Sequence, residues 1–358
     1  MQIQAAVLRH PDKPFVLEDV ELDDPGPGEV LVRIAGAGLC HTDLMYRSLP
    51  ELPMPMILGH EGSGVVEAAG PGVRRFAPGD HVVMSYDSCG HCPQCLAAAP
   101  CYCDEFIGRN FSGMRQDFSS AARDTAGSPV AARWFGQSSF ATHALATERN
   151  LVAVDTSLPI ETLGPLGCGV QTGAGSVLLA LGVRPASTIA IFGTGAVGLS
   201  AVMAARVAGA SEIIAVDLHT SRRDLALELG ATRALDGADP DLAAALGQAD
   251  YVLDTTGVPG VIATAVRALR PGGSCGLLGV GGGPITLEPE GFAGRSIRYI
   301  FEGEAVPQAF IPTLIRLWRQ GRFPFDRLIK TYPLSQANEA ERDSASGGCV
   351  KPVLLPET

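Results

Sequence analysis

The feature of this sequence that most restricts its fold is an alternation of apolar strands and helices in the middle of the chain. Residues 188–193 have the pattern of a buried strand, and residues 193–210 that of a helix preceded by closely spaced glycines. The alternation continues as strand, helix, strand, helix and strand at residues 212–217, 222–231, 251–257, 261–273 and 274–282. It predicts an α/β unit with a doubly wound parallel sheet, the Rossmann architecture.

The first third of the chain has a different pattern. Its apolar segments alternate with polar residues and are separated by Gly and Pro, at residues 5–10, 29–40, 61–70 and 79–84. This pattern predicts an all-β, barrel-like unit. Near the end we expect one more strand (298–303), a helix (308–321) and a short tail that returns to pack on the β unit. Two domains also fit a chain of 358 residues.

Composition and charge exclude several classes of protein. Lys and Arg number 27 against 38 Asp and Glu, and no basic block occurs, so nucleic acid and anionic membrane surfaces are not expected partners. The sequence has no apolar run of about 18 residues that would span a membrane. Its first residues lack the basic end and long apolar stretch of a signal peptide. We therefore expect a soluble, cytoplasmic protein.

The cysteines indicate a metal site rather than disulfides. Without a signal peptide, thiols are expected to stay reduced, and four of the nine cysteines have the spacing C-x2-C-x2-C-x7-C. Four thiolates in one short segment are typical ligands of a closed, structural zinc site. These four are Cys89, Cys92, Cys95 and Cys103. Cys101 competes for the fourth position, although the spacing favours Cys103, and His91 is expected to point outward.

A glycine motif lies between the first strand and the first helix of the alternating region. It has the form G-x-G-x-x-G and comprises Gly193, Gly195 and Gly198. Glycines there allow a tight turn and the approach of a pyrophosphate, which the N–H groups at the start of the helix then bind. Asp217 ends the next strand, where a carboxylate binds both ribose hydroxyls and repels a 2′-phosphate, so NAD is favoured over NADP. Arg222 and Arg223 weaken this preference, because an arginine accommodates that phosphate.

Other residues with potential chemistry are dispersed along the chain: Cys40, His60, Glu61 and Cys168. Spacing alone does not join residues so far apart, and taken singly each is expected to be structural, since a buried cysteine behaves as a small hydrophobe. His81 and His143 are also expected to be structural residues. Phe111, Trp134 and Phe135 fit a hydrophobic core and a pocket for an aromatic ring equally well.

Together these motifs resemble the zinc-containing medium-chain alcohol dehydrogenases over essentially the whole chain. The resemblance rests on G-H-E-x2-G-x5-G-x2-V from Gly59, the four-cysteine cluster, GCGVQTGAG around Cys168, and GTGAVG. Within the family, three segments are similar to the aryl (benzyl) alcohol dehydrogenase branch: NFSGM from Asn110, FGQSSFATHAL from Phe135 and QGRFPFDRLIKTY from Gln320.

The resemblance implies a GroES-like β catalytic domain, residues 1–172 and 301–358, and a Rossmann NAD-binding domain, residues 173–300. It also implies two zinc ions per chain, one catalytic and one structural. The implied reaction is the NAD-linked oxidation of a primary alcohol, aromatic or allylic, to its aldehyde, and the reverse. A homo-oligomer, dimer or tetramer, is expected, with residues 298–303 as the edge strand through which dimers form.

The resemblance implies roles for individual residues at the positions that match the family's motifs. The ligands of the catalytic zinc are implied to be Cys40, His60 and Cys168, with Glu61 adjacent as an occasional ligand. The implied cofactor-binding residues are His41, Gly193, Gly195, Val197, Gly198, Asp217, Arg222 and Lys351. Asp43 corresponds to the carboxylate that orients the zinc-bound histidine, and Thr42 to the hydroxyl that accepts the substrate proton.

One departure from the family affects the proton relay. Liver-type members have a histidine three residues after the relay hydroxyl, and here that position is Met45. Two alternative functions stay open on the sequence. The same chemistry could act on terpenoid, aliphatic or thiol-conjugated alcohols, because pocket shape decides among them. The other alternative is a non-catalytic nucleotide-binding family member, against which the complete set of zinc-ligating residues argues.

Overall fold

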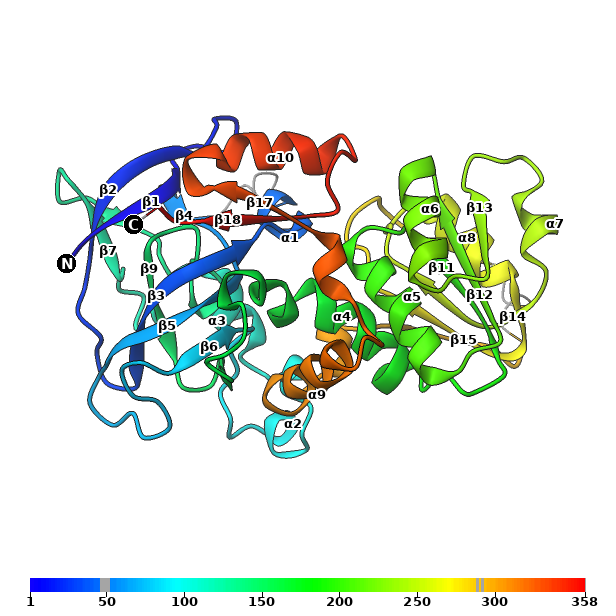
Figure 1. The fold of residues 1–358 in the computed structure, drawn as a ribbon, viewed down its shortest axis with the longest axis horizontal. Coiled ribbons are helices and arrows are strands. Elements are labelled where there is room, and N and C mark those ends of the chain that lie inside the picture. Colours follow the sequence, from blue (N-terminus) through cyan, green and yellow to red (C-terminus); the bar gives the residue numbers. More distant parts are fainter. Residues whose placement is uncertain (46–51, 288–289, 291–292, 358) are drawn as a thin grey trace. The chain divides into compact units, whose positions relative to one another are not determined.

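The structure is a computed structural model, and it describes residues 1–45, 52–287, 290 and 293–357. The chain divides into two compact units. Met1–Cys168, Val306–Pro312 and Leu328–Thr358 form the first, and Gly169–Ala305 with Thr313–Arg327 form the second. The two ends of the chain, blue and red in Figure 1, therefore belong to the same unit. Among the described residues, no helix combines the length and the apolar character that crossing a bilayer requires.

The first unit is built on two sheets. One has the strand order β4-β1-β2-β7-β8 and antiparallel pairs throughout. Its strands are β1 (Gln2–Leu8), β2 (Val16–Leu22), β4 (Met56–Ile57), β7 (Ala122–Asp124) and β8 (Pro129–Val130). The other has the order β10-β6-β5-β3-β18-β17, and β9 also pairs with β3. Its strands are β3 (Glu29–Gly38), β5 (Glu61–Ala69), β6 (His81–Met84), β9 (His143–Thr147), β10 (Leu151–Val154), β17 (Ile329–Pro333) and β18 (Lys351–Leu355).

Short helices connect these strands. The α-helices are α1 (His41–Met45), α2 (Pro93–Leu96), α3 (Phe106–Phe111) and α10 (Ala337–Ala345). The 3₁₀ turns are η2 (Pro100–Tyr102), η3 (Trp134–Gly136), η4 (Ile160–Thr162), η5 (Gly164–Gly167) and η10 (Leu334–Gln336). A further turn, η9 (Phe325–Leu328), belongs to the second unit except for Leu328. The C-terminal tail returns to this unit as predicted: β18 pairs with β3 through Val353 opposite Gly38. Its first four residues are buried, so this pairing completes the core of the sheet.

The second unit contains a parallel sheet in the order β13-β12-β11-β14-β15-β16. The strands are β11 (Thr188–Phe192), β12 (Glu212–Asp217), β13 (Arg233–Asp236), β14 (Ala249–Asp254), β15 (Leu269–Leu277) and β16 (Ser296–Tyr299). The helical segments are α4 (Gly169–Gly175), η6 (Ser176–Ala180), α5 (Ala196–Ala208), α6 (Thr220–Leu229), α7 (Leu242–Leu246), α8 (Pro259–Arg267) and η8 (Glu302–Glu304). α9 (Pro307–Arg319) follows, with residues in both units.

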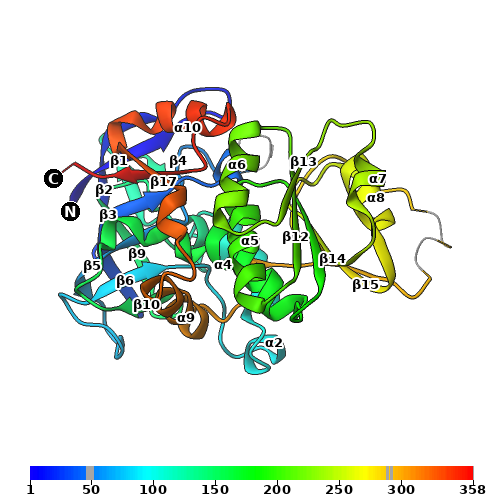
Figure 2. The same cartoon turned by 45° about the vertical axis from the view of Figure 1, so that its right-hand side comes forward.

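This sheet is doubly wound, as the sequence predicts. The chain starts at β11, adds β12 and β13 on one side, and then adds β14, β15 and β16 on the other. Figure 2 shows α5 and α6 on one face of the sheet and α7 and α8 on the opposite face. Leu246 of α7 and Ile262 of α8 share a buried cluster with Phe192 and Val216 of the sheet. The apolar strands, covered on both faces, form the core of the unit.

Three local predictions in this unit need correction. The helix expected at 261–273 ends at Arg267, because the chain re-enters the sheet at Leu269 and passes an irregularity before Ser274. The strand expected at 298–303 spans Ser296–Tyr299, and Phe301 precedes a 3₁₀ turn. The sequence predicts neither β13 nor α7, because β13 is short and only half-buried and so has no clear apolar pattern.

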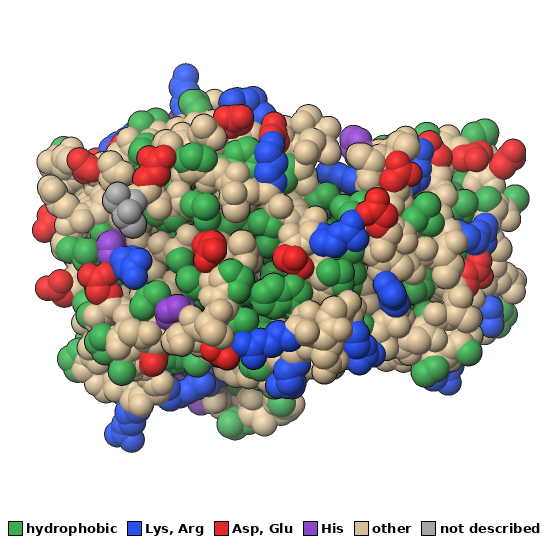
Figure 3. Space-filling view, in the orientation of Figure 1, with side chains coloured by type: hydrophobic (Ala, Val, Ile, Leu, Met, Phe, Trp, Pro, Cys, Tyr) green, Lys and Arg blue, Asp and Glu red, His purple; other side chains and the backbone are tan. Residues whose placement is uncertain are grey.

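On one face of the molecule, charge is spread rather than concentrated (Figure 3). On the face drawn in Figure 3, acidic and basic side chains are interspersed among apolar and uncharged ones. The chain as a whole carries a formal net charge of −11.

Candidate functional site

The first unit brings together four residues that the sequence leaves far apart. Single potential ligand atoms of Cys40, His60, Glu61 and Cys168 all lie within 4.8 Å of one another. Cys40 stands between β3 and α1, His60 and Glu61 stand at the start of β5, and Cys168 follows η5. Because β3 and β5 are antiparallel neighbours with Gly38 opposite Glu61, the end of one strand meets the start of the other. The sheet pairing therefore brings Cys40 to His60 and Glu61, and Cys168 joins them from the end of η5.

The His60 ring is held so that one nitrogen remains for a metal. Its Nδ1 lies 2.7 Å from Oδ1 of Asp43, and both side chains have no exposed surface. Its Nε2 is buried and forms no hydrogen bond with any described residue. A buried ring nitrogen without a partner is costly unless it binds something else. A metal-binding histidine typically gives its second nitrogen to a carboxylate, as His60 does.

The charges in this group also suit a metal ion. The Cys168 thiol hydrogen-bonds to Cys40 and, with the nearby charge of Lys351, holds the pKa of the Cys40 thiol well below its usual value despite burial. A thiolate is the form of cysteine that binds metal. Two sulfurs, one imidazole and an adjacent carboxylate match the donor set of a zinc site that keeps an open position. The residues present therefore fit a catalytic zinc ion.

Helix α1 carries three more of the predicted residues. Asp43 is fully buried, Thr42 is half-buried, and His41 is exposed. The Thr42 hydroxyl is 3.8 Å from the Cys40 sulfur, so it lies beside the metal group. Met45 ends the helix and is half-buried. Its thioether has no exchangeable proton, so it cannot replace a relay histidine.

Lys351 lies in the same group. It is 3% exposed, and its Nζ donates to a carboxylate oxygen of Glu61 at 2.8 Å and to the Leu39 carbonyl at 3.2 Å. Burial disfavours the charge of Lys351, but Glu61 and the two thiols outweigh it and raise the pKa of the ammonium. The predicted contact of Lys351 with a cofactor pyrophosphate remains a prediction.

The four-cysteine cluster forms a second metal group. The sulfurs of Cys89, Cys92, Cys95 and Cys103 converge. The sulfur of Cys89 is 3.9 Å from that of Cys95, and the sulfurs of Cys92 and Cys103 are also 3.9 Å apart. Zinc–sulfur bonds of about 2.3 Å would place tetrahedral ligands about 3.8 Å apart, so these two separations suit a zinc ion.

Backbone amides support this second group. The N–H of Cys92 donates to the Cys89 sulfur at 3.3 Å, and the N–H of Cys89 donates to the Cys103 sulfur at 3.3 Å. Backbone N–H groups of Asp104 and Cys95 lower the pKa of Cys92 to about 6, whereas burial raises the pKa of Cys103 to about 12. Cys101 is buried and lies outside the four. The side chain of His91 is 73% exposed, and a nitrogen of its ring lies within 4.8 Å of ligand atoms of Cys89 and Glu105.

The glycine motif forms the turn that joins β11 to α5 in the second unit. Gly193 has a φ of +82°, and a Cβ on Gly198 would lie 1.8 Å from the Gly193 carbonyl oxygen. A larger residue at either position would therefore strain the turn. Gly195 is the N-cap of α5, and a Cβ there would meet open space. Val197 lies in the first turn of that helix and is half-buried.

Asp217 ends β12 beside this turn. Its Oδ2 accepts hydrogen bonds from Thr194, from the backbone N–H at 2.7 Å and the hydroxyl at 3.0 Å. Arg223 donates to the Asp217 carbonyl at 2.8 Å and pairs with Asp236 at 3.1 Å. The half-buried Arg222 follows from the start of α6. The glycines and the acid that the sequence singles out are thus adjacent, and they fit a dinucleotide.

Comparison with known proteins decides the family. Residues 26–156 match the alcohol dehydrogenase GroES-like domain, and residues 196–318 match the zinc-binding dehydrogenase family. The chain is 48% identical to geraniol dehydrogenase of Castellaniella defragrans, over 98% of this chain and 97% of that one. The chain is a zinc-dependent medium-chain alcohol dehydrogenase. The family and the fold class expected from the sequence are both confirmed.

Solved structures agree with this assignment. An alcohol dehydrogenase zinc-binding domain protein from Burkholderia ambifaria has 49% identity and a TM-score of 0.97 over 100% of both chains. Benzyl alcohol dehydrogenase from Acinetobacter calcoaceticus has 43% identity and a TM-score of 0.95, again over 100% of both chains. The similarity of this alcohol dehydrogenase to its relatives therefore covers both units.

Three aromatic residues of this alcohol dehydrogenase, for which the sequence fits a core and a ring pocket equally well, lie near His60. Trp134 and Phe135 are buried members of the hydrophobic core of the first unit, and this part of the core lies against His60 of the metal group. The Phe135 ring stacks on His60 with 4.4 Å between centroids, and Phe111 lies 5.1 Å from Phe135. Trp134 and Phe135 lie in the connection between β8 and β9, far along the chain from His60. No motif spacing therefore indicates that they contact the metal group. His143 is a strand residue, in β9, as predicted.

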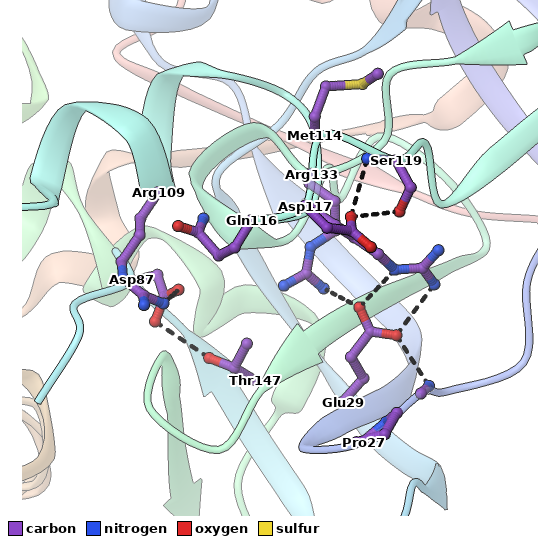
Figure 4. Close-up of a pocket in the computed structure, with 12 residues that line it drawn as sticks. Pro27, Glu29, Asp87, Arg109, Met114, Gln116, Asp117, Ser119, Arg133 and Thr147 are labelled. Atoms are coloured by element: carbon purple, nitrogen blue, oxygen red, sulfur yellow. Dashed lines mark hydrogen bonds and ion pairs between the residues drawn. The ribbon is translucent and has the colours of Figure 1, made fainter.

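A cavity of about 520 Å³ lies elsewhere in the first unit of this dehydrogenase. Figure 4 shows charged side chains around it, among them Glu29, Arg109 and Arg133. Arg109 pairs with Asp87 at 3.1 Å, Arg115 pairs with Glu29 at 3.0 Å, and Arg133 donates to the Leu145 carbonyl at 2.8 Å. Since these guanidinium groups already have partners, we interpret the cluster as structural.

Proposed function

We propose that this enzyme oxidises primary alcohols with an unsaturated carbon next to the carbinol carbon, using NAD as hydride acceptor. The observation that carries the chemistry is the buried group of two thiols and one imidazole whose Nε2 has no hydrogen-bond partner among the described residues. The substrate class is supported by two relatives, the geraniol dehydrogenase and the benzyl alcohol dehydrogenase. Their alcohols are allylic and benzylic, and they share this unsaturated neighbour.

In this proposal the domains are residues 1–172 with 301–358, which carry the catalytic group, and residues 173–300, which bind the nucleotide. Cys40, His60 and Cys168 hold the catalytic zinc ion, with Glu61 beside it. Cys89, Cys92, Cys95 and Cys103 hold the structural ion. When bound, the catalytic ion supplies Lewis acidity and NAD supplies a carbon that accepts hydride.

Residues beside the catalytic metal group transfer the proton of the alcohol and orient His60. The Thr42 hydroxyl accepts the hydroxyl proton of the alcohol, while a hydride leaves the carbinol carbon and an aldehyde forms. Onward transfer of the proton falls to the exposed His41 or to water, because Met45 cannot take part. Asp43 fixes the direction of His60.

The nucleotide-binding roles rest on the second unit. We assign the pyrophosphate to the N–H groups at the start of α5, near Gly193, Gly195 and Gly198, with Val197 in the same turn. His41 and Lys351 are assigned to the pyrophosphate from the first unit. Asp217 favours NAD, since its carboxylate binds ribose hydroxyls and repels a 2′-phosphate, and Arg222 lies beside it.

We also propose that the enzyme is a homo-oligomer that associates through β16. This strand lies at the edge of the sheet, and edge strands tend to be covered. Tyr299 and Phe301 leave 38% and 41% of their surface exposed at this edge. Light scattering of Ser296→Pro protein tests the assignment: dissociation supports it, and an unchanged mass contradicts it.

The test of the proposed function is NADH formation with benzyl alcohol, cinnamyl alcohol, geraniol and ethanol, with NAD or NADP supplied. We expect turnover of the three unsaturated alcohols with NAD, little with ethanol, and none after Cys40→Ser or Cys168→Ser. An active Cys40→Ser protein that keeps two zinc ions would overturn the ligand assignment. Turnover of ethanol alone would overturn the substrate class and leave the chemistry intact.

A further inference from the structure

The carboxylate that orients His60 has more than one donor. Besides the imidazole, Oδ1 of Asp43 accepts the Gly59 N–H at 3.1 Å and the indole Nε1–H of Trp134 at 2.9 Å. Its Oδ2 accepts the Cys40 N–H at 3.1 Å. Asp43 and Trp134 are both 0% exposed, so no water competes for these bonds. Two of these donors are side chains, the imidazole of His60 and the indole of Trp134. Of the two, only the indole comes from a residue outside the metal group.

The segment that carries Trp134 contacts His60 in two further ways. The Phe135 ring stacks on the imidazole at an interplanar angle of 23°. The Gln137 side-chain amide donates to the His60 carbonyl at 2.9 Å and accepts the Gly62 N–H at 3.0 Å. Together these contacts surround His60 on its ring face, at its backbone and, through Asp43, at Nδ1.

The backbone of this segment is strained. Phe135 has a φ of +50° and Ser138 a φ of +53°, values that residues with a side chain rarely adopt. Such strain persists only where surrounding contacts enforce it, and it is concentrated at functional sites. Here the Ser138 hydroxyl accepts the Trp134 N–H at 2.8 Å and donates to the Ile57 carbonyl at 2.6 Å, which fixes the turn.

We propose that Trp134 is a positioning residue for the catalytic metal, acting through the hydrogen bond from its indole to Asp43. The inference rests on the proposed function in one respect, namely that Cys40, His60 and Cys168 bind zinc. Without the indole, Oδ1 of Asp43 keeps two donors and the carboxylate can turn about its side chain. The orientation of the His60 ring, which Asp43 fixes, is then less restricted, and Nε2 is no longer held in one position toward the metal.

The experiment compares two tryptophans in the same chain. Trp318 also donates its indole N–H to an aspartate, Asp326, at 2.8 Å. Trp318 lies on α9, far along the chain from the catalytic metal group, and Asp326 is not a member of that group. Trp134→Phe and Trp318→Phe therefore each remove one indole–carboxylate bond of similar length. Release of zinc to a chromogenic chelator is measured for each purified holoenzyme, and the phase lost in Cys40→Ser identifies the catalytic ion.

We expect Trp134→Phe to release the catalytic zinc about tenfold faster, the low end of the loss in metal affinity that follows removal of a ligand's own partner, because Trp134 acts one bond further out, through Asp43. Trp318→Phe should match the wild type. The cobalt-substituted Trp134→Phe enzyme should show a shifted ligand-field spectrum. A second variant controls for the volume lost with the indole. Benzothienylalanine at position 134, in the Trp318→Phe background, keeps the ring size and replaces only the N–H by sulfur.

The outcomes separate the two proposals. Faster release and a shifted spectrum in both position-134 variants support the hydrogen bond as the positioning device. A benzothienylalanine enzyme with the release rate and spectrum of the wild type overturns it, since ring volume alone would then explain Trp134→Phe. If Cys40→Ser removes no zinc from the protein, the proposed function falls and this inference falls with it.

Discussion

The ammonium group of Lys351 lies 2.8 Å from the carboxylate of Glu61, and the two side chains are only 3% and 0% exposed. The residues are 290 positions apart in the sequence. They meet because β18 and β5 both pair with β3. Burial raises the pKa of Glu61, and the positive charge of Lys351 opposes that effect. The pair therefore places beside the metal ligands a carboxylate whose negative charge is balanced by Lys351.

Lys351→Met should lower the free energy of unfolding by about 3 kcal/mol, because removing one partner of a buried ion pair leaves the other charge without compensation. The measurement is urea unfolding at neutral pH. The double variant Lys351→Met with Glu61→Gln should recover most of the loss, since it removes both charges. A single variant as stable as the wild type would show that Glu61 is already neutral.

Cys92→Ser should remove one zinc ion per chain and impair folding or assembly more than the chemistry of the molecules that do assemble. Its sulfur is one of four that converge, so serine leaves an incomplete tetrahedron. Metal analysis and light scattering measure the two effects. Cys101→Ser is the matched control, because Cys101 is a buried cysteine of the same segment outside the group. Equal zinc content in both variants would contradict a structural site.

Asp217→Ser should lower kcat/KM for NAD by about 10- to 100-fold, the loss expected for hydrogen bonds to a charged group, and raise the use of NADP. Part of the loss should come from the glycine turn, because Asp217 also holds Thr194. Initial rates with both cofactors provide the measurement. Asp236→Ser is the control: this acid ends the neighbouring strand and pairs with Arg223. An unchanged ratio of NAD to NADP efficiency would argue against the assignment of Asp217.

The phenol of Tyr332 should lose its proton only at high pH. Burial and the hydrogen bond that its hydroxyl donates to Asp343, at 2.5 Å, raise the pKa of Tyr332 to about 12. An unfolded tyrosine titrates near pH 10. The folded pKa is the higher one, so this contribution to stability is complete below about pH 10 and is lost as the pH rises toward about 12.

Absorbance at 295 nm, followed during alkaline titration, tests this prediction. The Tyr332→Phe enzyme should lack one late step that the native wild type shows, and the two proteins should lose stability at different rates above about pH 10. Titration in guanidinium provides the reference in which all tyrosines ionise early. A Tyr332→Phe curve that lacks one early step instead of a late one would mean that Tyr332 ionises with the exposed tyrosines.

Features that depend on the local order of residues can be predicted from the sequence. Strand and helix periods predict the doubly wound sheet of the second unit, because side-chain direction repeats with the backbone geometry of each element. The glycine turn at Gly193 and the four cysteines from Cys89 to Cys103 could also be predicted, since each motif lies within one short segment. Errors arose where local patterns were weak, as at β13 and at the end of α8.

Which distant residues meet depends on the three-dimensional fold. Cys40, His60 and Cys168 converge because of strand pairing and a 3₁₀ turn, and the sequence suggested their grouping only through family resemblance. The bond from Trp134 to Asp43 spans 91 positions, and no motif spacing indicates it. The physical reason is that burial and hydrogen bonding act between neighbours in space. Strand order and register, which local periodicity does not encode, determine which residues become neighbours.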